Sequence, residues 1–445
     1  MFLEMTSGSR LQVVTVAAIL PATDNSVKVA EPATKTVTFG GYAVSVPAGW
    51  PVYDLAKDLR RCVRYDIHAV YLGAPGPDQD CSPGLVGRVE TVSIGSAAQT
   101  PAMAGLRTLA PGTIVQDPDL HELALAMPDA APPVEATYAT DPGPAEQILA
   151  TVRPDGTQPP ARHPVLVEDS IPTPATSTTS ATPDAPTSGP SLRPDAPARA
   201  GSPAPAPLAG FDTCAAPSLA TMKVWRAKYA ATVVYIGGPM MACDQSNLSA
   251  GWVQRAEAMG WALMPMYVGL QPPCDSYSGR INPKQAASQG TAAANHAIAA
   301  ASSYSLGPGS PIYYDMEAYD RTKPGCHTAV LTFLDAWTRQ LRSVGYVPGV
   351  YSSADAAIED LQTTTTIAGH PLAEPKAVWI ALWDNAANVS GAPYVTSAVW
   401  PAASRSKQYA GNKMVRVGGI SLDIDADLAG IVAARVTRRT DNRTG

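Results

Sequence analysis

The sequence predicts an α/β protein whose C-terminal half is a closed (β/α)8 barrel, preceded by a small β-rich domain and a proline-rich linker. Between 208 and 436, apolar segments alternate eight times with helical ones. Strands that alternate with helices form parallel sheets through right-handed crossovers, and eight strands suffice to close a barrel. An open doubly wound sheet would carry a glycine-rich phosphate loop after its first strand, where this chain has FDTC at 211–214.

The barrel elements follow one another in a regular order. Strands are predicted at 209–213, 232–237, 262–268, 311–317, 348–353, 377–383, 405–410 and 419–425. Helices are predicted at 219–229, 250–259, 284–304, 329–344 and 354–361. The last two connections carry no helical pattern, so no helix is predicted there.

Three zones of composition precede or link these elements. Residues 35–150 contain short β runs in which Val44 and Val46 alternate with smaller residues, and nothing there indicates catalysis. Residues 151–207 are expected to form an extended linker, because fourteen prolines lie amid Ser, Thr and Ala between 154 and 207. Since such a linker buries almost nothing, we expect the barrel at 208–436 to be an independent unit, followed by a tail at 437–445.

The first 34 residues contain a candidate export signal. Arg10 is followed by ten mostly apolar residues at 11–20, enough for the core of a signal and too few to span a bilayer. A buried strand is the alternative. No other segment could cross a membrane, and six scattered cysteines favour three disulfides in an oxidising compartment. We therefore expect a secreted, extracellular or cell-wall-associated protein.

Several classes of function are disfavoured. A formal net charge of −6 argues against a nucleic-acid binder, which needs a basic face. His296, His327 and His370 have no recurring ligand spacing, so neither a metal nor another cofactor is predicted. No G-x-S-x-G elbow for a nucleophilic serine is present. A monomer is expected.

Acidic residues stand at the ends of four predicted barrel strands, where side chains face a shared cleft. They are Asp212 on the first strand, Asp315 and Glu317 on the fourth, Asp384 after the sixth, and Asp423 and Asp425 on the eighth. Residues two apart on a strand point to the same side, so Asp315 and Glu317 should both face the barrel mouth. Crowded carboxylates raise at least one pKa, which a general acid near neutral pH requires.

Cysteine positions predict three disulfides. The last four cysteines follow strands one to four, whose neighbouring loops can bring Cα atoms within ~4.4–6.8 Å. The predicted pairs are Cys62–Cys81, Cys214–Cys243 and Cys274–Cys326.

Five motifs together resemble a known family. They are FDTC at Phe211, YYDMEAYD at Tyr313, GVYSS at Gly349, ALWDN at Ala381, and KQYAG followed by LDID near the end. The set resembles the glycoside-hydrolase-like domain of unknown function 1906, found in secreted actinobacterial proteins and similar to the glycoside hydrolase family 25 muramidases. The resemblance covers about half the chain, roughly 208–433, and implies a barrel that binds or cleaves cell-wall glycan.

The resemblance also implies residue roles. Glu317 would be the proton donor, and Asp315 would either stabilise an oxocarbenium ion or orient an acetamido group. Asp212 and Asp423 would complete the acid set, although Asp425 matches the strand-eight position equally well.

Aromatic and polar residues on the same rim would bind sugar. Tyr351 and Trp383 are the expected stacking surfaces, while Asp384, Gln408 and Asp425 would hydrogen-bond hydroxyls. The first hypothesis is a secreted glycosidase acting on peptidoglycan-type glycan. The alternatives are a non-catalytic glycan-binding or envelope-organising protein, and a scaffold whose N-terminal unit binds a partner.

Overall fold

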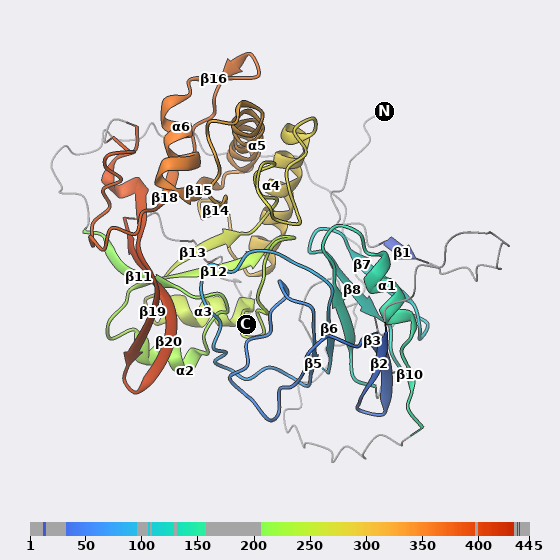
Figure 1. Ribbon diagram of the computed structural model, residues 1–445. Helices are drawn as coiled ribbons and strands as arrows, with labels where there is room; N and C mark the ends of the chain where they lie inside the picture. Colours follow the sequence, from blue (N-terminus) through green and yellow to red (C-terminus); the bar gives the residue numbers. More distant parts are fainter. Residues whose placement is uncertain are drawn as a thin grey trace, which may run out of the picture.

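The computed structural model describes residues 12–14, 33–95, 106, 109–128, 131–156, 206–396, 399–430, 434 and 436 (Figure 1). The linker from 157 to 205, most of the candidate signal and the tail lie outside the described residues. Within the described part, no helix is long and apolar enough to cross a membrane.

The N-terminal part contains two sheets. A seven-stranded sheet has the order β1-β7-β8-β9-β6-β5-β4, and a three-stranded sheet has the order β10-β3-β2. The first comprises β1 (Gln12–Val14), β4 (Val52–Asp54), β5 (Ala69–Leu72), β6 (Thr91–Ile94), β7 (Ile114–Asp117), β8 (Glu122–Leu125) and β9 (Val134–Thr137), and the second β2 (Thr34–Phe39), β3 (Tyr42–Pro47) and β10 (Arg153–Pro154). Since β1 pairs with β7, part of the segment for which a signal or a strand was expected is a strand.

One apolar core joins these two sheets. Val44 and Val46 of β3 are fully buried and belong to the same cluster as Val92 of β6 and Leu123 of β8. Leu149 of helix α1 (Gly143–Ala150) closes this core. The alternation of valines in β3 therefore buries one face, as the sequence predicts.

The C-terminal part is a closed barrel of eight strands, which confirms the predicted fold class. Its strands are β11 (Leu208–Asp212), β12 (Ala231–Gly237), β13 (Ala262–Tyr267), β14 (Pro311–Asp315), β15 (Val347–Ser353), β18 (Ala377–Ala381), β19 (Arg405–Val417) and β20 (Ile420–Ala429). Outside it lie α2 (Leu219–Trp225), α3 (Ala250–Ala258), α4 (Ala286–Ser303), α5 (Pro324–Ser343), a π-helical turn (Ala354–Ile358), α6 (Glu359–Thr363) and the short β16 (Thr366–Ile367) and β17 (His370–Pro371).

The last strand departs from the predicted parallel barrel. β20 is antiparallel to both β19 and β11, because β19 and β20 form a hairpin rather than a crossover unit. Gly418 and Gly419 turn the chain with φ of +56° and +90°, a left-handed conformation that glycine adopts without strain. The hairpin leaves no length of chain for an eighth helix.

The outer helices seal the barrel with one apolar face each. In α5, Phe333, Leu334, Trp337 and Leu341 recur at helical spacing and are fully buried. α4 and α5 approach closely at Gly290, where a β-carbon would lie 2.2 Å from the carbonyl oxygen of Phe333. The apolar layer between the barrel and helices α4 and α5 is therefore one packed core.

The two parts of the chain share an interface that the sequence did not predict. The N–H of Tyr65 donates to the carbonyl of Ala242 at 2.7 Å, and the N–H of Asp244 donates to the carbonyl of Val63 at 3.2 Å. The Tyr65 hydroxyl also donates to the buried Asp244 carboxylate at 3.2 Å. In Figure 1 the connections around β5 and β6 lie against the barrel. The barrel therefore packs against the N-terminal part of the chain.

The cysteines pair as predicted. Cys62–Cys81, Cys214–Cys243 and Cys274–Cys326 have Cα–Cα distances of 4.9, 5.8 and 5.7 Å. The first pair belongs to the N-terminal part and the second to the barrel. The sulfur atoms of Cys62, Cys81 and Cys243 lie within 4.8 Å of one another, so these two disulfides pack together at the interface.

Candidate active site

A buried glutamine holds the backbone of the Asp315–Glu317 segment. β14 ends at Asp315, so Glu317 lies just beyond the strand instead of within it as predicted. The Gln271 side chain donates from Nε2 to the carbonyl of Asp315 at 2.9 Å and accepts the N–H of Glu317 at 2.9 Å. Gln271 is fully buried in the loop after β13. Sequence reasoning missed it, because a loop glutamine carries no local signal.

Asp315 and Glu317 interact electrostatically. Burial, followed by the charge and hydrogen bond of Glu317, raises the pKa of Asp315 well above its usual range. Burial raises the pKa of Glu317 to about 7, with a further contribution from Asp275 and opposition from the hydrogen bond of Asp315. Near neutral pH the two carboxyls therefore hold at least one proton between them.

Asp212 is fixed by a hydrogen-bond network centred on Gln408. Gln408 donates from Nε2 to Asp212 at 3.0 Å, and its Oε1 accepts from the Tyr351 hydroxyl at 3.1 Å and from the Trp383 indole at 2.8 Å. The Tyr235 hydroxyl donates to the other Asp212 oxygen at 3.3 Å. Burial nevertheless raises the pKa of Asp212. The network thus brings four of the predicted site residues together.

The register of β20 places Asp425 beside Asp212. The two residues are directly opposite each other, and the N–H of Asn412 donates to Asp425 at 2.6 Å. Burial, followed by the charge of Asp212, raises the pKa of Asp425 to about 8. The sequence left the choice between Asp423 and Asp425 open. Asp423 lies opposite Met414 in the projecting hairpin, so Asp425 is the one level with Asp212.

Asp427 is a buried acid that the sequence analysis missed. It lies opposite Gly210, two residues beyond Asp425 on β20, and is only 1% exposed. Burial and the charges of Asp212 and Asp425 raise its pKa well above the usual range. The predicted strand ended at 425, and the antiparallel direction is what carries Asp427 down into the barrel. Period-2 spacing from Asp423 would have found it.

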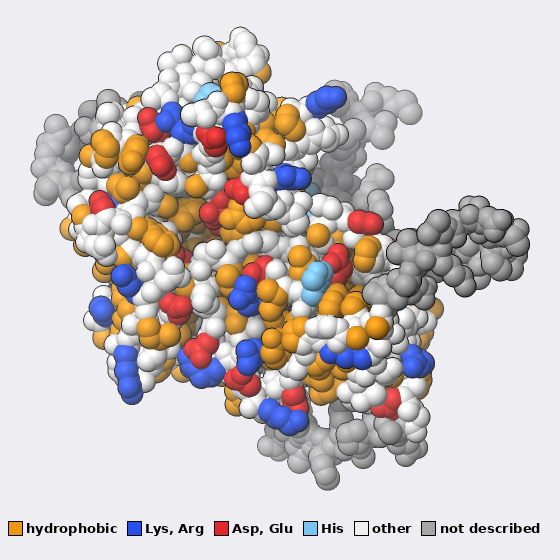
Figure 2. Space-filling view, in the orientation of Figure 1, with side chains coloured by type: hydrophobic (Ala, Val, Ile, Leu, Met, Phe, Trp, Pro, Cys, Tyr) orange, Lys and Arg blue, Asp and Glu red, His pale blue; other side chains and the backbone are white. Residues whose placement is uncertain are grey.

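Asp384 and Trp383 have different environments. Asp384 forms an ion pair with the buried Lys407 at 2.7 Å. Trp383 is 53% exposed, and its ring lies against the backbone at Gly411, where a β-carbon would be 2.2 Å from the ring. One face of this indole is therefore open to solvent. Figure 2 shows a hollow on the barrel side of the molecule, with acidic side chains around it.

The arrangement suits proton transfer. Five carboxyl groups interact within one barrel end, namely Asp212, Asp315, Glu317, Asp425 and Asp427. None of them forms an ion pair with a cation in the described part of the chain, so burial and mutual repulsion keep their pKa values high. Among described residues, the only cluster with metal-ligand spacing is Cys62, Cys81 and Cys243, and all three are in disulfides.

A family model matches most of the barrel. Residues 222–429 match the model of the Rv2525c-like, glycoside hydrolase-like domain. The C-terminal half therefore carries an Rv2525c-like glycoside hydrolase-like domain. The match spans β12 to β20 and includes every acid of the site except Asp212. No curated protein sequence matches the chain.

Solved structures similar to part of this chain include three bacterial proteins. An uncharacterized protein of B. stearothermophilus is 18% identical, with 50% of this chain and 95% of that chain covered and a TM-score of 0.33. The modular autolysin LytC of Streptococcus pneumoniae is 16% identical, with 50% and 46% covered and a TM-score of 0.32. The spore cortex lytic enzyme SleM of Clostridium perfringens is 11% identical, with 46% and 62% covered and a TM-score of 0.32. The chain thus spans less than two thirds of LytC and SleM.

Proposed function

We propose that the protein is a secreted glycosidase that cleaves peptidoglycan-type cell-wall glycan, with Glu317 as the general acid. One arrangement carries the proposal: the buried Gln271 holds Glu317 next to Asp315 at the end of β14, and burial there raises the pKa of Glu317 to about 7. An acid with this pKa is protonated often enough near neutral pH to deliver a proton to a leaving oxygen. The three disulfides suit an extracellular location.

Asp315 is assigned to substrate orientation rather than to charge stabilisation. Its pKa lies well above the usual range, so the group stays neutral and can donate a hydrogen bond. Its Oδ1 is buried and has no hydrogen-bond partner among described residues. A buried polar atom without a partner suits a group supplied by the substrate, such as an acetamido group.

The remaining site residues would bind the sugar. The exposed indole of Trp383 offers a stacking surface, and Tyr351 and Trp383 both donate to Oε1 of Gln408. Asp212 and Asp425 face each other across β11 and β20. Asp212, which accepts hydrogen bonds from Gln408 and Tyr235, is assigned to the side of the sugar ring where positive charge develops, and Asp425 would hydrogen-bond sugar hydroxyls. Asp423 would act only through its charge on Asp425.

Release of reducing sugar from insoluble peptidoglycan tests the proposal. Glu317→Gln should lower kcat by about 10²–10⁴-fold while leaving glycan retention unchanged, because glutamine keeps the shape but delivers no proton. Asp384→Asn is the matched control and should keep most activity, because Asp384 faces Lys407. Wild-type activity in Glu317→Gln would refute the role of Glu317.

One observation favours a second function, glycan binding without turnover. All five acids of the cluster have raised pKa values, so the site lacks a carboxylate with the low pKa expected of a charge-stabilising group. A protein that retains peptidoglycan but releases no reducing sugar between pH 4 and 8 would support this reading over hydrolysis.

A further inference from the structure

A segment of the N-terminal part is anchored at both ends on the barrel interface. Cys81 begins it and is joined to Cys62, whose disulfide packs on Cys243. Arg88 ends it, is fully buried, and donates to the carbonyl of Met241 at 2.8 Å. The N–H of Gly87 adds a bond to the carbonyl of Met240 at 2.8 Å. The chain between these anchors is therefore held in a fixed position.

Gly84 lies in the middle of this segment, next to the acid cluster. A β-carbon on Gly84 would lie 4.0 Å from Oδ2 of Asp425, with no other atom outside its own chain neighbours nearer. Gly84 is exposed and has a φ of +68°. Backbone of the N-terminal part thus borders the space in front of an acid that faces Asp212.

Other contacts put the N-terminal part on the same end of the barrel. Asp78 accepts from the N–H of Ser218, after β11, at 2.9 Å. The Ser278 hydroxyl, after β13, donates to the carbonyl of Arg88 at 3.1 Å. Arg60 donates to the carbonyl of Ser421 in the β19–β20 hairpin at 3.3 Å. These loops follow the carboxyl ends of strands, where active sites of barrels are built.

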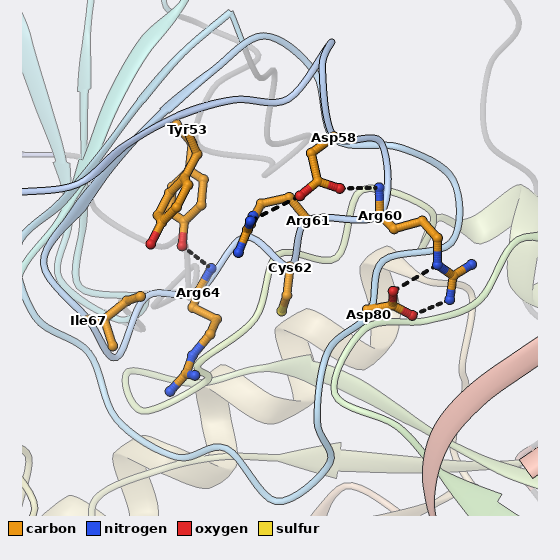
Figure 3. Close-up of a pocket in the computed structure, with 9 residues that line it drawn as sticks. Tyr53, Asp58, Arg60, Arg61, Cys62, Arg64, Ile67 and Asp80 are labelled. Carbon is orange, nitrogen blue, oxygen red and sulfur yellow. Dashed lines mark hydrogen bonds and ion pairs between the residues drawn. The ribbon is translucent and has the colours of Figure 1, made fainter. Parts of the chain in front are cut away.

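Two neighbouring cavities lie in the N-terminal part and between it and the β19–β20 hairpin. One of about 330 Å³ is lined by Tyr53, Tyr71 and three arginines (Figure 3). The other, of about 550 Å³, lies between the N-terminal part and the hairpin, and both cavities share Arg60 and Asp80. Arg60 is paired with Asp80, so this shared wall offers hydrogen-bonding groups without net charge.

We propose that the N-terminal part forms one wall of the active site, with the segment 82–85 in contact with glycan bound at Asp425. This inference rests on the proposed function and makes the site a composite of both parts. Gly84 is then a specificity-determining position, because a side chain there would project into the space that the glycan occupies. The role for the N-terminal part is steric and polar rather than catalytic.

Paired variants at two glycines test the wall. Gly84→Asn adds a side chain beside Asp425, and asparagine tolerates the left-handed backbone. Gly112→Asn is the control, since Gly112 has a φ of +88° and nothing within 4 Å of its β-carbon position. Retention of insoluble peptidoglycan by the full-length protein should fall about tenfold for Gly84→Asn and stay unchanged for Gly112→Asn. Equal retention by both variants would overturn the contact with glycan.

A second measurement needs no glycan. Gly84→Asp and Gly84→Asn differ only in charge, so the carboxyl titration of Asp425, followed by NMR, should move upward by about one pH unit in Gly84→Asp relative to Gly84→Asn. The Gly112→Asp and Gly112→Asn pair should show no difference. Identical titrations at Gly84 would refute the wall itself. A wild-type protein that retains no glycan would instead contradict the proposed function while these titrations still decide the wall.

Discussion

Two buried clusters of charge in this protein differ in whether the charges are paired. At the interface, the fully buried Arg88 forms an ion pair with Glu122 at 2.8 Å and also donates to the carbonyl groups of Leu120 and Met241. At the barrel mouth, five carboxyls face one another without a cation in the described part of the chain.

Because one cluster is paired and the other is not, the two clusters have different roles. The buried Arg88–Glu122 pair, through the bond from Arg88 to the carbonyl of Met241, favours one arrangement of the two parts that it joins. Like charges in a buried site cost stability, and such a cost persists where it shifts pKa values toward a task. The interface pair therefore orients the two parts of the chain, and the acid cluster at the barrel mouth is the one suited to the proposed reaction.

Removing the cation of the paired cluster should have the largest effect on stability. We expect Arg88→Ala to lower the free energy of unfolding by about 3–5 kcal/mol, because it leaves Glu122 buried without its partner. Urea denaturation of the full-length protein measures this. The double variant Arg88→Met with Glu122→Leu should recover most of the loss. A loss below about 1 kcal/mol in Arg88→Ala would show that the pair does not fix the interface.

Separating the two parts should have the next largest effect. A fragment of residues 206–445 loses the partners of Ala242 and Asp244, and each buried hydrogen bond is worth on the order of 1 kcal/mol. We expect its thermal midpoint to fall below that of the same domain in the full-length protein. A fragment as stable as the full-length protein would restore the sequence-based expectation of an independent barrel.

The unpaired cluster should make stability depend on pH. The folded-state pKa of Glu317 is raised from 4.5 to about 7, so the folded protein binds this proton more tightly than the unfolded chain does. The resulting stabilisation is fully present below about pH 4.5 and is lost as the pH rises to about 7. The free energy of unfolding should therefore fall over this range, by up to about 1.4 kcal/mol per pH unit for each such group. Denaturation at several pH values should show a smaller slope in Glu317→Gln. An unchanged slope would contradict the raised pKa.

The smallest expected effect is the loss of activity in a variant of Asp315, the partner of Glu317. If Asp315 is neutral, Asp315→Asn keeps a hydrogen-bond donor and should lower kcat by about tenfold, less than Glu317→Gln. The same assay of reducing sugar measures both variants side by side. A loss in Asp315→Asn as large as that in Glu317→Gln would mean that Asp315 acts through its charge.

Much of the fold follows from local signals in the sequence. All eight barrel strands overlap their predicted positions, because apolar β-rich runs and helix-forming stretches are properties of short segments. β19 extends seven residues past its predicted end at 410, to Val417, because it forms the β19–β20 hairpin. The cysteine pairs follow from strand order, since loops after successive strands are neighbours. The sequence also places acidic residues at the ends of the predicted barrel strands.

What the sequence by itself determined is therefore the element order, the disulfides and the acidic strand ends. Only the tertiary structure decided which acids meet: it turned β20 antiparallel, set Asp425 against Asp212, and brought Asp427 into the barrel. It also decided the position of Gln271 and the approach of Gly84 to Asp425. These contacts join residues far apart in sequence, so their geometry depends on how whole elements pack rather than on any local pattern.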